Sequence, residues 1–78
     1  MRYWIDVSRL FDETFDWADD DIIKENCPGE FAGSGAGFGY RDISFELDYP
    51  FSKKDTEKLT NKLVSLIGDT KGLTIEYY

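Results

Sequence analysis

Apolar and polar side chains alternate in residues 2–8, in residues 40–49 and in residues 72–78. A period of two places the apolar side chains on one face of a strand and the polar ones on the other. We therefore predict three strands that each bury one face. The clearest alternation runs through Ile43, Phe45 and Leu47.

Residues 52–68 have the spacing of an amphipathic helix. Ser52 and Asp55 form a capping-box pattern at its start, and Gly68 is typical of a helix end. Between them, Leu59 and Leu63 begin an apolar stripe at steps of four. The sequence therefore predicts a helix that packs this stripe against the strands.

The segment between the first two predicted strands has weaker helical spacing. Apolar residues at steps of four, three and four fit one helical face; they are Phe11, Phe15, Ala18 and Ile22. Aspartates at the same spacing repel one another, so we predict a helix only from about Trp17 to Asn26. Asp16 or Asp19 is the expected cap, and Pro28-Gly29 the expected end.

Residues 30–39 are rich in glycine and precede the clearest strand. A phosphate-binding loop is followed by a helix rather than a strand, and its surroundings are seldom negative, so nucleotide binding is not expected. We interpret the stretch as a mobile hairpin loop that contains at most a short or irregular strand. A partner-binding loop around Phe38 is the second interpretation.

The predicted order of strand, helix, two strands, helix and strand is that of a ferredoxin-like βαββαβ fold. We expect one α+β domain over residues 1–78, with both helices on one face of a small antiparallel sheet. The expected core consists of Ile5, Phe45, Leu47, Leu59, Leu63, Leu66 and Ile75, with Ile67 completing the helical stripe. The expected open face carries Trp4, Asp6, Asp42, Ser44, Glu46, Asp48, Thr74, Glu76 and Tyr78.

The composition argues against catalysis. The chain contains no histidine and a single cysteine, Cys27. Histidine-dependent catalytic sites and a protein-only zinc site therefore cannot be built within it. The acidic residues lack the spacing of a calcium loop, and each is expected on an exposed face. We predict a protein that is not an enzyme and has no cofactor, metal or nucleotide.

The charge of the chain is concentrated in one segment. Residues 12–30 contain eight acids and one lysine, a local charge of −7, and the remaining chain has eight acids and eight bases. Nucleic acids and anionic membranes would be repelled by this segment. Concentrated like charge is typical of an interaction surface, so we predict a protein partner with a basic surface.

Two surfaces are candidates for binding that partner. The first is the acidic segment with its aromatic residue: Asp12, Glu13, Asp16, Trp17, Asp19, Asp20, Asp21, Glu25 and Glu30. The second combines the open sheet face with the hairpin: Phe38, Asp42, Glu46, Asp48, Glu76 and Tyr78. The sequence does not show which of the two surfaces binds the partner.

In size, acidity and α/β layout, the whole chain resembles the small acidic proteins that phages make against bacterial defence systems, including anti-CRISPR proteins and DNA mimics. The resemblance implies an inhibitor that occupies the basic nucleic-acid channel of its target, such as a CRISPR effector complex, in the cytoplasm of the bacterial host. Two alternatives stay open. One is an immunity or antitoxin-like protein that neutralises a basic toxin, and the other is an assembly module that dimerises through its sheet. Monomer and homodimer are both compatible with the sequence.

Overall fold

The computed structural model describes residues 2–13, 15–68 and 72–78. Its elements are, in order, β1 (Tyr3–Leu10), α1 (Ala18–Asn26), β2 (Glu30–Gly37), β3 (Tyr40–Leu47), α2 (Lys53–Ile67) and β4 (Thr74–Tyr77). The prediction of an α+β class, with one antiparallel sheet and two helices, is confirmed. Among the described residues, no helix has both the length and the apolar character needed to cross a membrane.

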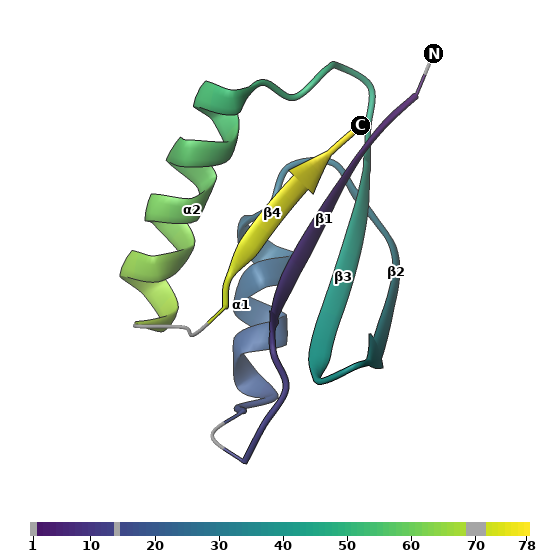
Figure 1. The fold of residues 1–78 in the computed structure, drawn as a ribbon. Coiled ribbons are helices and arrows are strands. Elements are labelled where there is room, and N and C mark those ends of the chain that lie inside the picture. Colours follow the sequence, from purple (N-terminus) through teal and green to yellow (C-terminus); the bar gives the residue numbers. More distant parts are fainter. Residues whose placement is uncertain (1, 14, 69–71) are drawn as a thin grey trace.

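The four strands form one open sheet in the order β2-β3-β1-β4, and every neighbouring pair is antiparallel (Figure 1). β3 therefore lies between β1 and β2, while β1 lies between β3 and β4. β2 and β4 are the edges. β2 was predicted to be short or irregular; it is as long as β1 and β3, but its register shifts between Phe31 and Gly33.

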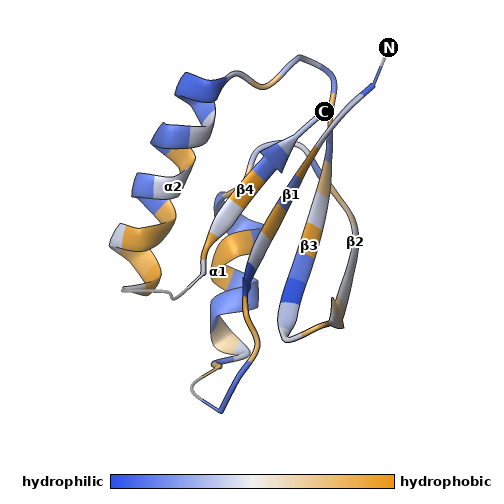
Figure 2. Cartoon of the chain, viewed as in Figure 1, coloured by the Kyte–Doolittle hydropathy of each residue, from blue (hydrophilic) through white to orange (hydrophobic). Residues whose placement is uncertain are grey.

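One face of the sheet is buried against both helices. Alternate strand residues supply most of the core, which consists of Ile5, Val7, Ile23, Ile43, Phe45, Leu47, Leu59, Leu63 and Ile75. Figure 2 shows these hydrophobic positions as bands on β1, β3 and β4, and it shows hydrophilic residues on either side of the hydrophobic middle of α1. Leu66 was predicted in this core but is 49% exposed, because the stripe of α2 continues from Leu63 to Ile67, which packs against the core, and Leu66 lies beside it.

Helix α1 turns a different face to the sheet from the one its spacing predicted. Its buried residues are Asp20 and Ile23, whereas Ile22 is only half-buried and Ala18 is exposed. Asp19 lies inside the helix and does not cap it, so that alternative is wrong. Asp16 does accept a hydrogen bond, at 2.9 Å, from the amide of Ala18, the first helical residue.

The predicted caps of α2 are confirmed. The Ser52 hydroxyl accepts a hydrogen bond from the Asp55 amide at 3.1 Å, and the Asp55 carboxylate accepts one from the Ser52 amide at 3.0 Å. Gly68 ends the helix with a φ of 82°, in the left-handed region that glycine favours. The polar start and glycine end seen in the sequence therefore set both boundaries.

The glycine-rich stretch is a hairpin arm rather than a mobile loop. β2 pairs with β3 as far as Gly37 and Tyr40, so only Phe38 and Gly39 form the turn. Both have positive φ, 52° and 81°, as a tight type I′ turn requires. The Phe11 amide donates to the Gly39 carbonyl at 2.7 Å, which ties the turn to the end of β1. Phe38 itself is fully exposed.

Candidate functional site

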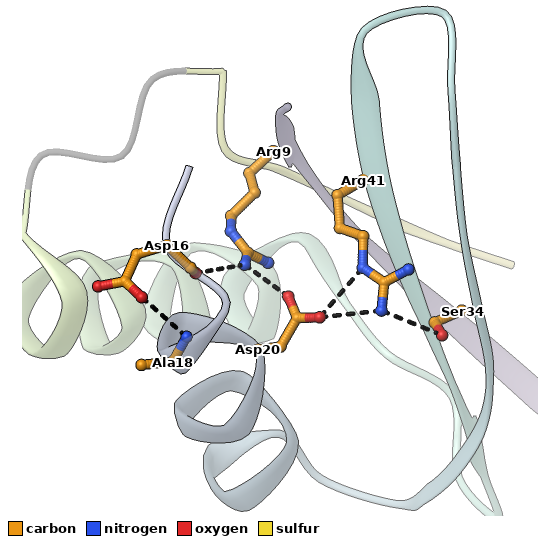
Figure 3. A network of polar contacts seen from close by, with 6 residues as sticks. All are labelled: Arg9, Asp16, Ala18, Asp20, Ser34 and Arg41. Carbon is orange, nitrogen blue, oxygen red and sulfur yellow. Dashed lines mark hydrogen bonds and ion pairs between the residues drawn. The ribbon is translucent and has the colours of Figure 1, made fainter. Parts of the chain in front are cut away.

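A buried ion-pair network holds α1 to the sheet. Arg9 of β1 and Arg41 of β3 lie directly opposite each other, and the carboxylate of Asp20 from α1 reaches both (Figure 3). Asp20 Oδ1 accepts from Arg9 Nη2 at 2.5 Å, and Oδ2 accepts from Arg41 Nε and Nη2 at 3.0 and 2.9 Å. Arg9 and Asp20 are 2% and 4% exposed. The carboxylate thus relieves the repulsion between two like charges paired across the strands.

Aromatic rings cover this network. Phe11 stacks on Phe15 with ring centroids 4.5 Å apart, and Trp17 meets both rings edge-on. The guanidinium of Arg9 lies 4.3 Å from the Phe15 ring centroid, and that of Arg41 lies 5.0 Å from the Trp17 centroid. These cation–π contacts fix the chain that leads into α1. Trp17 remains 56% exposed, so much of its ring is available at the surface.

The prediction that Asp20 is an exposed partner-binding residue is wrong. Its carboxylate is used inside the protein to form ion pairs with both Arg9 and Arg41. The sequence contained a sign of this pairing. Arg9 follows Ile5 and Val7 at the same spacing of two, so it lies on the buried face of β1. Two arginines carried onto the buried face need a carboxylate, and the opposing helix supplies one.

The other carboxylates of the acidic segment stay near the surface. Asp12, Glu13, Asp16, Asp21, Glu25 and Glu30 are exposed, and Asp19 is half-buried. Within the described ranges, Glu13, Asp16, Asp19, Asp21 and Glu25 form no ion pair with a basic side chain. With Asp20 removed by burial, seven acids and Lys24 leave a surface charge of −6 in residues 12–30. The segment is therefore negative and held in a fixed position.

Glu30 lies apart from the carboxylates of α1. It begins β2 and pairs directly with Glu46 of β3. Both line a depression of about 410 Å³ together with Arg2, Gly29, Leu47 and Asp48. Arg2 forms an ion pair with Glu46, which offsets part of the repulsion. Glu30 thus joins the second predicted surface rather than the first.

The second predicted surface is divided between two ends of the sheet. Phe38 precedes β3, whereas Asp48 follows its other end. Between them the open face is tied by side-chain hydrogen bonds. Asp6 accepts from Ser44 at 2.6 Å and from the Tyr78 hydroxyl at 2.5 Å, and Asp42 accepts from Ser8 at 2.6 Å. The bond to Asp6 raises the pKa of the Tyr78 hydroxyl. Glu76 lies opposite Asp6 on the edge strand β4, and its side chain is exposed.

Cys27 is not set up as a nucleophile. Burial raises the pKa of its thiol to about 12, and the nearby Lys62 ammonium offsets only part of this rise. The thiol is therefore protonated at neutral pH, and a protonated thiol is a poor nucleophile and metal ligand. Within the ranges that the structure describes, no group of three or more acidic or cysteine side chains is arranged to hold a metal ion.

Comparison of the chain with protein-family models, with curated proteins and with solved structures finds no match. The most distinctive features of the chain are the anchored acidic helix α1, the exposed Trp17 beside it, and the edge strand β2.

Proposed function

We propose that this protein is a non-enzymatic inhibitor that binds a basic nucleic-acid-binding surface on another protein and competes there with the nucleic acid. The observation that carries the proposal is the anchoring of α1. Asp20 locks the helix onto Arg9 and Arg41, while Asp21 and Glu25 remain exposed and form no ion pair with any described residue. Carboxylates fixed in position can engage the lysines and arginines that otherwise bind phosphates.

Trp17 adds an apolar contact to the charged surface. Its ring is 56% exposed and is held by Phe11 and Phe15, so little side-chain freedom remains to be lost on binding. Rigid aromatic residues with charged neighbours are frequent hot spots of protein interfaces. The carboxylates would then speed encounter with a positive surface, and Trp17 would slow dissociation.

We extend the proposal to the fold type and to the cell in which the protein acts. We assign the fold as ferredoxin-like, supported by the βαββαβ order and by a strand lying between the two strands of each βαβ unit. In type, we place the protein with the acidic anti-defence proteins of phages, with a CRISPR effector complex as the target in the bacterial cytoplasm. Its net charge of −7 favours a basic protein target over nucleic acid.

A DNA-competition assay tests this function. Guide-loaded CRISPR effector complexes are incubated with labelled target DNA and increasing amounts of the protein. We expect the bound DNA to fall for at least one complex, and the inhibition to weaken as salt rises. Changing Asp19 and Asp21 to Asn and Glu25 to Gln, with Asp20 retained, should slow association and raise the inhibitory concentration about tenfold or more.

The matched control removes the same number of charges elsewhere. Asp48, Glu57 and Glu76 are exposed acids outside α1, and their Asn and Gln variants should inhibit nearly as well as the wild type. Equal inhibition by the α1 variant and the wild type would show that α1 is not the interface. If no effector complex is inhibited, the anti-CRISPR assignment fails.

A further inference from the structure

β2 is an edge strand of the sheet. The sheet order leaves its outer side unpaired by any strand in the described part of the chain. Alternate residues of an antiparallel strand direct their N–H and C=O groups to opposite sides, so about half of those in β2 point outward. Seven of its eight residues are exposed. Such an edge can pair with another extended chain.

The usual protection of an edge strand is missing from most of β2. Natural edges carry lysine, proline or inward-pointing charges, or are very short. β4, the other edge, has only four residues, whereas β2 has eight and contains neither lysine nor proline. The bulge between Phe31 and Gly33 disturbs only its beginning. The segment from Gly33 to Gly37 is therefore the accessible edge of the sheet.

The glycines of β2 are not required by packing within the chain. Gly33, Gly35 and Gly37 lack positive φ, and a Cβ at any of them would meet nothing within 4 Å. They pair with Ser44, Asp42 and Tyr40 and so share the open face with them. Because side chains are absent there, β2 leaves a clear path across the sheet surface to β3.

Carboxylates lie at the end of that path. Asp42 is directly opposite Gly35. Among the described residues, the one side-chain partner of Asp42 is the neutral hydroxyl of Ser8. Beside the glycines, at the start of the hairpin, Glu30 faces Glu46, which forms an ion pair with Arg2. An added strand would lie about 4.8 Å beyond β2, so its side chains would begin about 9.6 Å from those of β3. The long stem of a lysine or arginine can cross bare Gly35 and bring its charge to Asp42.

We propose that β2 is a docking edge for an extended, lysine- and arginine-rich segment of the partner, which joins the sheet as a fifth strand. This proposal rests on the proposed function for the positive charge of the partner. Charge complementarity decides the occupant, because a second copy would bring its own charge of −7 to the same edge. Backbone pairing would supply affinity, and Asp42 behind Gly35, together with Glu30 beside the glycines, would select basic side chains.

The test uses two synthetic eight-residue peptides of equal charge. In the first, lysine alternates with valine; in the second, proline replaces each valine, which removes backbone donors and prevents strand pairing. Binding is followed by chemical shifts and hydrogen exchange of the protein's backbone amides. We expect the lysine–valine peptide to shift and protect amides of residues 33–37, and the proline peptide to bind about tenfold more weakly or worse.

Three variants locate the contact. Gly35→Lys should weaken the lysine–valine peptide about tenfold, because the new ammonium occupies the path and pairs with Asp42. Gly35→Ala adds only a Cβ in open space and should bind normally. Thr74→Lys adds the same charge on the other edge, β4, and should change binding less than about threefold. Thermal unfolding verifies that each variant is folded.

Several results would overturn the docking edge. If both peptides bind equally and shift the amides of α1, binding is electrostatic alone; the proposed function then survives without strand addition. If neither peptide binds, or if the protein dimerises through β2 in sedimentation experiments, the basic-strand occupant is wrong. The proposed function is judged separately by the DNA-competition assay.

Discussion

Arg9 of β1 lies directly opposite Arg41 of β3, and the two guanidinium groups share the carboxylate of Asp20. This arrangement gives one acid of residues 12–30 a structural role instead of an exposed position. One of the eight acids in that segment fastens α1 to the sheet, and the helix so fastened presents Asp19, Asp21 and Glu25. In the described part of the structure, Arg9 Nη1 is buried without a hydrogen-bond partner, while Arg9 Nη2 also donates to the backbone carbonyl of Asp16 at 3.4 Å.

Removing the shared carboxylate should destabilise the fold strongly. We expect Asp20→Asn to lower the free energy of unfolding by about 3–5 kcal/mol, because Arg9 is left as an uncompensated buried charge. Urea denaturation measures the effect. Asp21→Asn is the matched control: this neighbour is exposed, and its change should stay within about 0.5 kcal/mol. Equal effects of the two variants would contradict the structural role of Asp20.

Replacing Phe38, at the tip of the hairpin, with a residue suited to positive φ should stabilise the fold. Phe38 has a φ of 52°, which is strained for a bulky side chain, and its ring is fully exposed. Asn-Gly is the favoured pair for this turn, so Phe38→Asn should raise the free energy of unfolding by about 0.5–1 kcal/mol. Phe38→Val, which is branched at Cβ, should lower it. If Phe38→Asn also weakens partner binding, the strain is retained for function.

Two leucines of the same helix should respond differently to truncation. Leu63→Ala should cost about 2–5 kcal/mol, because Leu63 is fully buried and its loss leaves a cavity. Leu66→Ala should cost much less, since Leu66 is 49% exposed. Phe45→Ala, at the centre of the sheet, should cost about 3–5 kcal/mol. Thermal unfolding distinguishes these variants, and a large cost at Leu66 would show that the end of α2 is packed more tightly.

The Cys27 thiol should be unreactive in the folded protein and reactive after unfolding. Its pKa is about 12 in the fold and 9.0 without burial. Between those values the unfolded chain loses the thiol proton while the folded chain keeps it, so stability falls as pH rises from about 9 to 12. Cys27→Ala should show a smaller fall over this range in urea denaturation. Rapid labelling by a thiol reagent at pH 8 without denaturant would contradict the burial.

Sequence patterns were sufficient for three of the strands, β1, β3 and β4, and for the limits of α2. The alternation through Ile43, Phe45 and Leu47 determined which face of β3 is buried, because a period of two admits only two phases. Ser52, Asp55 and Gly68 determined the limits of α2, because capping depends on neighbouring backbone groups. The concentration of acids in residues 12–30 was likewise visible in the sequence and marks the proposed interface.

Only the tertiary structure decided the orientation of α1 and the state of β2. Aspartate is so commonly exposed that a run of aspartates in a sequence predicts a surface segment. The burial of Asp20 instead depends on two arginines 11 and 21 positions away. The glycines likewise favoured a mobile loop, and pairing with β3 made them a strand. Local sequence thus determined where the charge lies, whereas long-range pairing determined which carboxylate anchors the helix and which remain available, because ion pairs and strand edges form between segments distant in the chain.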